Sequence, residues 1–315
     1  MSLKSTSGRV LLLDTNQASL PILQSLKDQG FSVSVCGNRP DEPLVEIADR
    51  FHNLDYSDLA ALEYLLKDSG YDCVIPGCND KSYEVLTHLA ARKIIRCSID
   101  LPQVAERLSS KKLFAELCQS LDLPIPKTFI LERPEEITFP VIVKPIDSFS
   151  GQGVSIASNK DELDSAALIA KKISPSRNVI VQEYIAGDLW SISGFLIAGR
   201  FVFSQTVREF CNDNPYQVDF SYIDTLPEKA NLNIIKGIEA LAKHANLVDG
   251  LFHAQFIMSL RGPVFVEVMR RCPGDLYNRL IELSTGLNYS ELYSRGFLGT
   301  LHDCSPPSTY DGYRT

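Results

Sequence analysis

The 315-residue sequence lacks several features that would assign it to common classes of protein. It has no apolar run of about 20 residues, so no transmembrane helix is expected. Residues 1–8 are polar, and no signal peptide is expected there. Hydrophobic residues make up 44% and charged residues 22%, which excludes disordered and collagen-like chains. These observations predict a cytoplasmic globular protein that does not contact a membrane.

Metal-binding cysteine pairs and basic clusters are also missing. The eight cysteines include no CxxC pair, and their scattered positions favour reduced thiols over a zinc site. The net charge is −8, and the basic residues form no continuous stripe. Nucleic acid is therefore not expected as a partner.

The order of the segments predicts an α/β unit followed by a strand-rich part. Strands and helices alternate over residues 9–97, which predicts a parallel sheet with helices on both faces. The first strand-to-helix turn, residues 14–17, contains no glycine, so dinucleotide binding of the G-x-G-x-x-G type is not expected. We predict an α/β domain (1–98), a helical connector (99–126), two α+β lobes (127–187 and 188–301) and a tail (302–315).

A lysine and a small-residue loop follow an apolar strand. The strand, residues 141–144, delivers Lys144 at its end, and the loop contains Ser148, Ser150, Gly151 and Gly153. Backbone N–H groups in such a loop can fold over phosphate oxygens, and the lysine adds positive charge. The alternative is a surface hairpin with a lysine that extends into solvent.

Two further segments fit a nucleotide. Residues 179–188 are a strand that ends in a short link, which can offer backbone groups to the edge of an adenine; an ordinary strand and turn is the alternative. Lys111 and Lys112 lie in the first turn of a helix, where positive charge opposes the helix dipole by about 0.3–1 kcal/mol. This placement indicates a bound anion, or else a solvated pair.

The second predicted hairpin contains a candidate metal site. With a three-residue loop at 260–262, Ser259 faces Pro263 and Gln255 faces Glu267, both side chains lying on one face. Magnesium prefers one or two carboxylates together with phosphate oxygens and water. In this register Phe265 and Met269 share the face of Glu267, so a lone carboxylate there would be costly. His253 would face Met269, where a structural role is favoured.

Arg271 follows the second strand of this hairpin, just beyond Glu267. A guanidinium group there can bind a carboxylate or stabilise a transferring phosphoryl group. Asp275 begins the next predicted helix, where capping is its favoured role. Other substrate contacts are expected from residues 208–224, with Arg208, Asp213, Tyr216 and Tyr222 as candidates.

Taken together, the segments resemble the ATP-grasp superfamily, in its carbamoyl-phosphate-synthase-like and amino-acid-ligase-like branch. The motifs that carry the resemblance are the lysine-bearing helix with its LPIP stop, PVIVKP with its glycine loop, VQEYIAGD, HAQF, and FVEVMRRCPGD. They follow one another in the family order over residues 9–300. The resemblance implies a Rossmann-like pre-ATP-grasp domain, then an ATP-grasp fold whose two lobes, a lid lobe and a C-terminal lobe, sandwich ATP.

The resemblance also implies roles for individual residues. Lys111 and Lys144 would contact the phosphates of ATP, and residues 148–153 would form a mobile flap. Gln182, Glu183, Tyr184 and Ile185 would hold adenine, with Glu183 as the leading contact, and Asp188 would complete this cofactor-binding set. Gln255 and Glu267 would bind Mg²⁺ or Mn²⁺, and Arg271 would act in catalysis on the acyl phosphate or the substrate carboxylate.

The implied reaction joins a small-molecule carboxylate to an amine through an acyl phosphate, releasing ADP and phosphate. Family members are often dimers, so the resemblance allows a homodimer. The family usually has E-x-N-x-R where this chain has Met269 in place of asparagine, and a thioether is a poor magnesium ligand. Met269 therefore gives the alternative of an ATP-binding module without turnover. A second alternative is a carboxyphosphate- or carbamoyl-forming enzyme.

Overall fold

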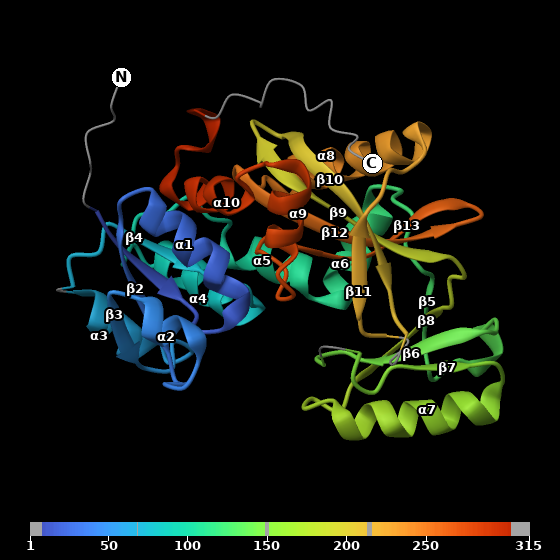
Figure 1. Cartoon of the computed structure of the whole chain (residues 1–315). Coiled ribbons are helices and arrows are strands. Elements are labelled where there is room, and N and C mark those ends of the chain that lie inside the picture. The colour runs from blue at the N-terminus through green and yellow to red at the C-terminus, as the bar shows by residue number, and fades with distance from the viewer. Residues whose placement is uncertain (1–7, 68, 149–150, 213–215, 304–315) are drawn as a thin grey trace.

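The computed structural model describes residues 8–67, 69–148, 151–212 and 216–303. Its N-terminal part is a parallel sheet in the order β3-β2-β1-β4, which confirms the predicted α/β unit (Figure 1). Its elements are β1 (Arg9–Leu13), η1 (Gln17–Ser19), α1 (Leu20–Asp28), β2 (Ser32–Gly37), α2 (Pro43–Ile47), β3 (Arg50–Asn53), α3 (Leu59–Lys67), β4 (Cys73–Pro76) and α4 (Asp80–Ala91). Strand β1 is buried from residue 10 to residue 13, as expected for a sheet covered on both faces.

The connector contains two helices, α5 (Pro102–Ser109) and α6 (Lys111–Ser120). Ser110 caps α6, because its side chain accepts a hydrogen bond from the Leu113 N–H at 3.4 Å. After α6 the chain runs along the edge of a later strand, where the Phe265 N–H donates to the Pro124 carbonyl at 2.8 Å. This bond holds the segment that follows α6 against that strand.

The next unit is an antiparallel sheet in the order β5-β8-β6-β7, with one long helix on its outer side (Figure 1). We call this unit the lid. Its elements are β5 (Thr128–Phe129), η2 (Pro134–Glu136), β6 (Val141–Pro145), β7 (Ser155–Ala157), α7 (Lys160–Ile173) and β8 (Val179–Glu183). The lid has a hydrophobic core of its own, in which Val141, Val143 and Val181 pack against Leu163 and Ala170 of α7.

The C-terminal part is built on a five-stranded antiparallel sheet in the order β11-β10-β9-β12-β13. Its strands are β9 (Asp188–Ile197), β10 (Arg200–Phe210), β11 (Phe220–Ile223), β12 (Gly250–Ser259) and β13 (Gly262–Met269), and α8 (Glu228–Ala245) lies between β11 and β12 in sequence. One face of the sheet forms a core with α8 and α6, including Ile238, Leu117 and Phe256.

The opposite face is covered by the C-terminal helices α9 (Tyr277–Thr285) and α10 (Tyr289–Leu298), which precede the short η3 (Leu301–Asp303). Phe195 and Val207 of this face belong to the same hydrophobic core as the N-terminal sheet. Tyr293 of α10 donates to the Pro76 carbonyl of β4 at 3.1 Å. The N-terminal and C-terminal parts therefore share one continuous core.

The second hairpin corrects part of the predicted register. Ser259 pairs with Gly262 and Met258 with Pro263, so the loop has two residues, not three. Phe256 pairs with Phe265, and Gln255, the residue before it, pairs with Glu267, so β13 has one extra residue at a bulge. The bulge restores the predicted Gln255–Glu267 pair. Because of the bulge, Phe265 lies in the α8 core while Glu267 is exposed, so the expected burial cost at Glu267 is absent.

Other sequence expectations meet mixed outcomes. Helices α2 and α10 and strand β11 are absent from the predicted elements. Helix α9 begins at Tyr277, so its N-cap position is Leu276 and not Asp275, although the Asp275 carboxylate accepts a hydrogen bond from the Tyr277 N–H. The seven described cysteines are free thiols, as expected. Within the described ranges, no helix combines the length and apolar character needed to span a bilayer. Most of the predicted tail, residues 304–315, lies outside the described part of the chain.

Candidate active site

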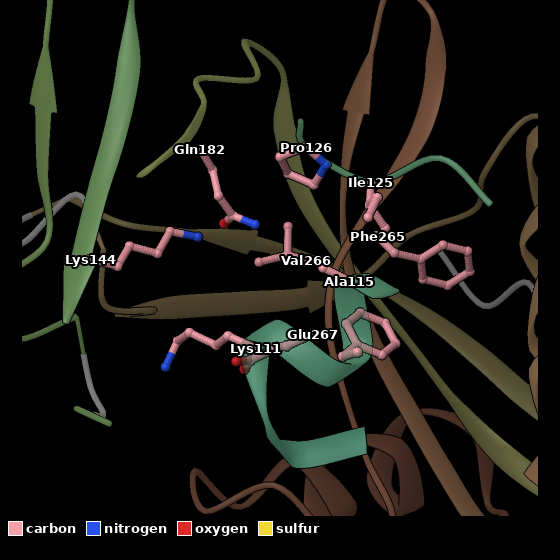
Figure 2. Close-up of a pocket in the computed structure, with 10 residues that line it drawn as sticks. Lys111, Ala115, Ile125, Pro126, Lys144, Gln182, Phe265, Val266 and Glu267 are labelled. Atoms are coloured by element: carbon pink, nitrogen blue, oxygen red, sulfur yellow. The ribbon is translucent and has the colours of Figure 1, made fainter. Parts of the chain in front are cut away.

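A pocket lies where α6, the lid and β13 meet (Figure 2). Lys144 and Gln182 reach it from the lid, Lys111 from α6, and Glu267 from β13. Figure 2 shows the Lys144 amine and the Gln182 amide projecting from neighbouring lid strands toward Val266. The remaining lining residues are mainly apolar: Phe114, Ala115, Ile125, Pro126, Phe265 and Val266. The arrangement places cations and an apolar surface on opposite sides of one site.

The two lysines predicted to bind an anion both line this pocket. Burial lowers the pKa of the Lys144 amine to about 8, and the nearby Lys111 acts in the same direction, while Glu267 opposes the shift. Lys111 Nζ donates to the carbonyls of Ile146 at 3.2 Å and Ser148 at 3.4 Å. Lys111 therefore ties the start of α6 to the loop that follows Lys144.

The link predicted to hold adenine leaves the lid at the end of β8. Gln182 is buried and donates to the Thr128 hydroxyl at 3.3 Å, while Ile185 is buried and Tyr184 is partly exposed. The Glu183 carboxylate accepts from Arg261 at 2.7 Å, so its side chain joins the lid to the tip of the second hairpin. The side chain of Glu183 thus has a structural partner. The N–H groups of Glu183 and Tyr184 are also bonded within the lid, to the carbonyls of Lys127 at 2.8 Å and Pro140 at 3.2 Å.

The glycine loop is described except for Phe149 and Ser150, so the expectation for Ser150 lies outside the described residues. Gly151 and Gly153 have φ angles of +67° and +72°, which side chains other than glycine rarely adopt. A Cβ on Gly151 would lie 2.5 Å from the Tyr216 carbonyl oxygen. The Ser148 hydroxyl donates to the Gln152 carbonyl at 3.0 Å within the loop. The loop therefore packs closely against the connection between β10 and β11.

Glu209 of β10, which is absent from the predicted site residues, joins the predicted metal pair. Gln255 Nε2 donates to a Glu209 carboxylate oxygen at 2.8 Å, and Glu209 is only 4% exposed. Burial, helped by the charges of Asp275 and Glu267, raises the pKa of Glu209 to about 7 against the effect of its bonds to Ser191 and Gln255. The sequence pattern predicts a strand only over residues 200–207, whereas β10 continues to Phe210, and its alternation places Glu209 on the face of Val207.

The donor set around Glu267 fits a hard cation only if a phosphate completes it. In the part of the chain that the structure describes, no group of three His, Cys, Asp or Glu side chains could hold a metal ion. Gln255 and Glu267 are cross-strand partners, and both carry oxygen donors. Magnesium commonly uses one or two carboxylates together with substrate phosphates and water. The residues present therefore suit a metal–nucleotide complex better than a free ion.

Arg271 lies at the boundary with the N-terminal part, where its guanidinium group forms a two-point ion pair with Asp80, the first residue of α4. Nε and Nη2 donate to the two carboxylate oxygens at 2.7 and 2.9 Å. The Arg271 side chain is 13% exposed and that of Asp80 is 68% exposed. In this structure the Arg271 guanidinium group is thus paired with a carboxylate of the protein itself, and its predicted role toward a substrate stays a prediction.

The remaining candidates lie elsewhere. Arg208 forms an ion pair with Asp188 at 2.7 Å and lies over the Trp190 ring, on the face opposite Glu209. Tyr222 stacks on Phe210 at a centroid distance of 5.6 Å. The backbone of Tyr216 contacts the glycine loop, and Asp213 lies outside the described residues. His253 pairs with Met269 as predicted and packs edge-on against Tyr277.

Comparisons with known proteins found a matching domain family and similar proteins. Residues 137–277 match the model of the ATP-grasp domain. A formate-dependent phosphoribosylglycinamide formyltransferase from Prochlorococcus marinus (strain NATL1A) is 24% identical over 306 residues, covering 92% of this chain and 76% of that protein.

Two solved structures share the fold. The L-amino acid ligase from Bacillus licheniformis has a TM-score of 0.76 at 17% identity, covering 92% of this chain and 74% of that one. The N5-carboxyaminoimidazole synthetase from Staphylococcus aureus, complexed with ADP, has a TM-score of 0.77 at 15% identity, covering 97% and 79%.

Proposed function

Because the chain belongs to the ATP-grasp superfamily, we propose that it is an ATP-dependent ligase that joins a carboxylate to an amine through an acyl phosphate. The observation that carries the proposal is the convergence of Lys111, Lys144, Gln182 and Glu267 on one pocket. These residues come from three separate parts of the chain, and they supply both the cations and the carboxylate that a metal–triphosphate complex requires. The protein in this scheme acts through positioning and charge neutralisation.

Each residue has a role in this proposal. Lys144 and Lys111 neutralise phosphate charge, and the loop around Gly151 and Gly153 closes over the phosphates and excludes water from the acyl phosphate. The apolar residues of the pocket cover the base, with the backbone of residues 182–185 at its edge. Gln255 and Glu267 hold Mg²⁺ or Mn²⁺, which when bound neutralises the charge that develops during phosphoryl transfer.

Arg271 is proposed to bind the substrate carboxylate or the acyl phosphate. The support is its two-point pairing with Asp80, a geometry in which a guanidinium group commonly holds a carboxylate. We further propose a cytosolic location, in keeping with the free thiols of the described chain. A homodimer stays a prediction, which light scattering of the purified protein would test.

The decisive experiment measures ADP release from ATP and Mg²⁺ over a panel of small carboxylates, each with and without a panel of amines. A ligase releases ADP only with a matching pair and forms one amide per ADP. Release with bicarbonate alone would support the carboxyphosphate alternative. If ATP binds but no substrate causes ADP release, the ligase proposal fails, and Met269 then indicates an ATP-binding module without turnover.

The metal assignment has its own test. Removing the carboxylate with Glu267→Gln should abolish Mg²⁺-dependent ATP binding, because the remaining amide oxygens bind this ion weakly. Isothermal titration calorimetry with and without Mg²⁺ measures the effect. Unchanged metal dependence in the variant would remove Glu267 from the site.

A further inference from the structure

Four polar side chains form a row across the C-terminal sheet. Gln255 on β12 lies opposite Ser191 on β9 and opposite Glu267 on β13. Ser191 lies opposite Val207 on β10, which places Glu209, two residues further along β10, on the same face. Gln255 therefore stands between Glu209 on one side and Glu267 on the other.

The small side chain of Ser191 makes the contact across β9 feasible. Ser191 is fully buried, and its hydroxyl shares a hydrogen bond of 2.8 Å with the Tyr277 hydroxyl of α9. Gln255 Nε2 reaches past it to a Glu209 oxygen at 2.8 Å. Glu209 is nine-tenths or more buried, so this hydrogen bond is protected from solvent.

A glutamine amide has two unlike ends, and only its oxygen can bind a metal ion. The NH₂ end of Gln255 donates to Glu209, on the side away from β13. The oxygen end is consequently directed to the side of Glu267. Outer contacts of this kind fix the orientation of metal ligands in many proteins.

We propose that Glu209 is a positioning residue of the metal site, which holds the Gln255 amide so that its carbonyl oxygen faces Glu267. This inference rests on the proposed function, because it takes Gln255 and Glu267 as the ligands of a metal–nucleotide complex. It also explains why a glutamine can serve at position 255, since the neighbouring carboxylate selects one of the two amide orientations. A glutamate at this position would need no such selection, because its two oxygens are equivalent.

The test is a double-mutant cycle on Mn²⁺ binding, measured by electron paramagnetic resonance of the full-length protein with ADP. Four proteins are compared: the wild type, Glu209→Gln, Gln255→Glu, and the double variant. When Gln255 is kept, Glu209→Gln is expected to weaken Mn²⁺ binding by about 10- to 100-fold. When Gln255→Glu is already present, the same change is expected to leave Mn²⁺ affinity equal or higher, because it also removes repulsion between two carboxylates.

A purely structural role for Glu209 would weaken Mn²⁺ binding equally in both backgrounds, and that result would overturn the inference. Equal affinity of Glu209→Gln and wild type would overturn it as well. If the wild type binds ADP but Mn²⁺ does not join the complex, the proposed metal site and this inference fall together. Glu239→Gln is the matched control, because Glu239 lies on α8 at the other face of the sheet and accepts from the Phe201 N–H at 3.1 Å.

Discussion

At the scale of single residues, the protonation state of Lys144 is expected to control the affinity of the pocket for an anion. Its pKa is lowered to about 8, chiefly by burial, so the free protein loses this charge as the pH rises through about 8. A bound phosphate favours the protonated amine. ADP affinity measured without metal should therefore be constant well below pH 8 and fall above it, by up to about tenfold per pH unit.

Lys144→Gln should weaken ADP binding by about tenfold or more and remove this pH dependence, because a charge-assisted hydrogen bond is lost. Calorimetric titration at a series of pH values provides the measurement. The control is Lys112→Gln on the exposed side of α6, which should match the wild type. A Lys144→Gln variant that keeps the wild-type pH profile would assign the titration to another group.

The place of a residue in the site could be predicted from the sequence only where its neighbours along the chain were informative. Lys144 follows an apolar strand and precedes a glycine loop, so its place at the pocket could be anticipated. Glu209 could not, because its importance depends on β9 lying between β10 and β12, and strand order is a tertiary property. The same holds for two ion pairs, Glu183 with Arg261 and Arg271 with Asp80, because each is set by packing between separate units.

At the scale of elements, the glycine loop between β6 and β7 is the part most sensitive to a single methyl group. Gly151→Ala would place a Cβ 2.5 Å from the Tyr216 carbonyl oxygen and strain a φ of +67°. We expect the loop to move away from the β10–β11 connection. Amide formation should then be at least about tenfold slower, which corresponds to an activation free energy higher by about 1.4 kcal/mol. The ratio of ADP to amide should rise, because water then reaches the acyl phosphate.

Gly199→Ala is the matched control for this prediction. Gly199 has a φ of +74°, but nothing lies within 4 Å of its Cβ position. The control variant carries the same kind of backbone strain without the clash and should keep the wild-type ratio of ADP to amide. Equal behaviour of the two variants would attribute the effect to backbone strain alone.

The second hairpin illustrates how far pattern can predict an element. A three-residue loop without a bulge and a two-residue loop with a one-residue bulge place Gln255 opposite Glu267 equally well. The predicted hairpin has the first arrangement, and the structure has the second. Alternation could not distinguish them, because the bulge is fixed by Phe265 packing into the α8 core, a contact distant in sequence.

At the scale of the whole molecule, a buried ion pair joins the connector to the C-terminal sheet. Arg270 Nε donates to Asp100 at 2.7 Å, and the same carboxylate accepts from Tyr83 of α4 at 2.8 Å and from the Val248 N–H at 2.9 Å. Asp100→Asn should lower the free energy of unfolding by about 3–5 kcal/mol, because Arg270 is left as an uncompensated buried charge. Urea denaturation monitored by circular dichroism gives the value.

The comparison for this variant is Glu84→Gln, which removes an exposed ion pair with Lys81 at 2.9 Å. It should change the unfolding free energy by no more than about 1 kcal/mol. Similar losses in the two variants would show that the buried network adds nothing beyond a surface pair.

The separate core of the lid has a consequence for how the chain could be recombined. The N-terminal and C-terminal parts share one core, so exchanging either part with a relative would require both sides of that core to match. The lid has a core made of its own residues, and it is joined to the remainder by polar contacts such as Lys111 with Ile146 and Arg261 with Glu183. The lid could therefore be exchanged as a unit. A lid from a relative that supplied these polar contacts could be grafted between residues 126 and 188 without redesigning the N-terminal and C-terminal parts.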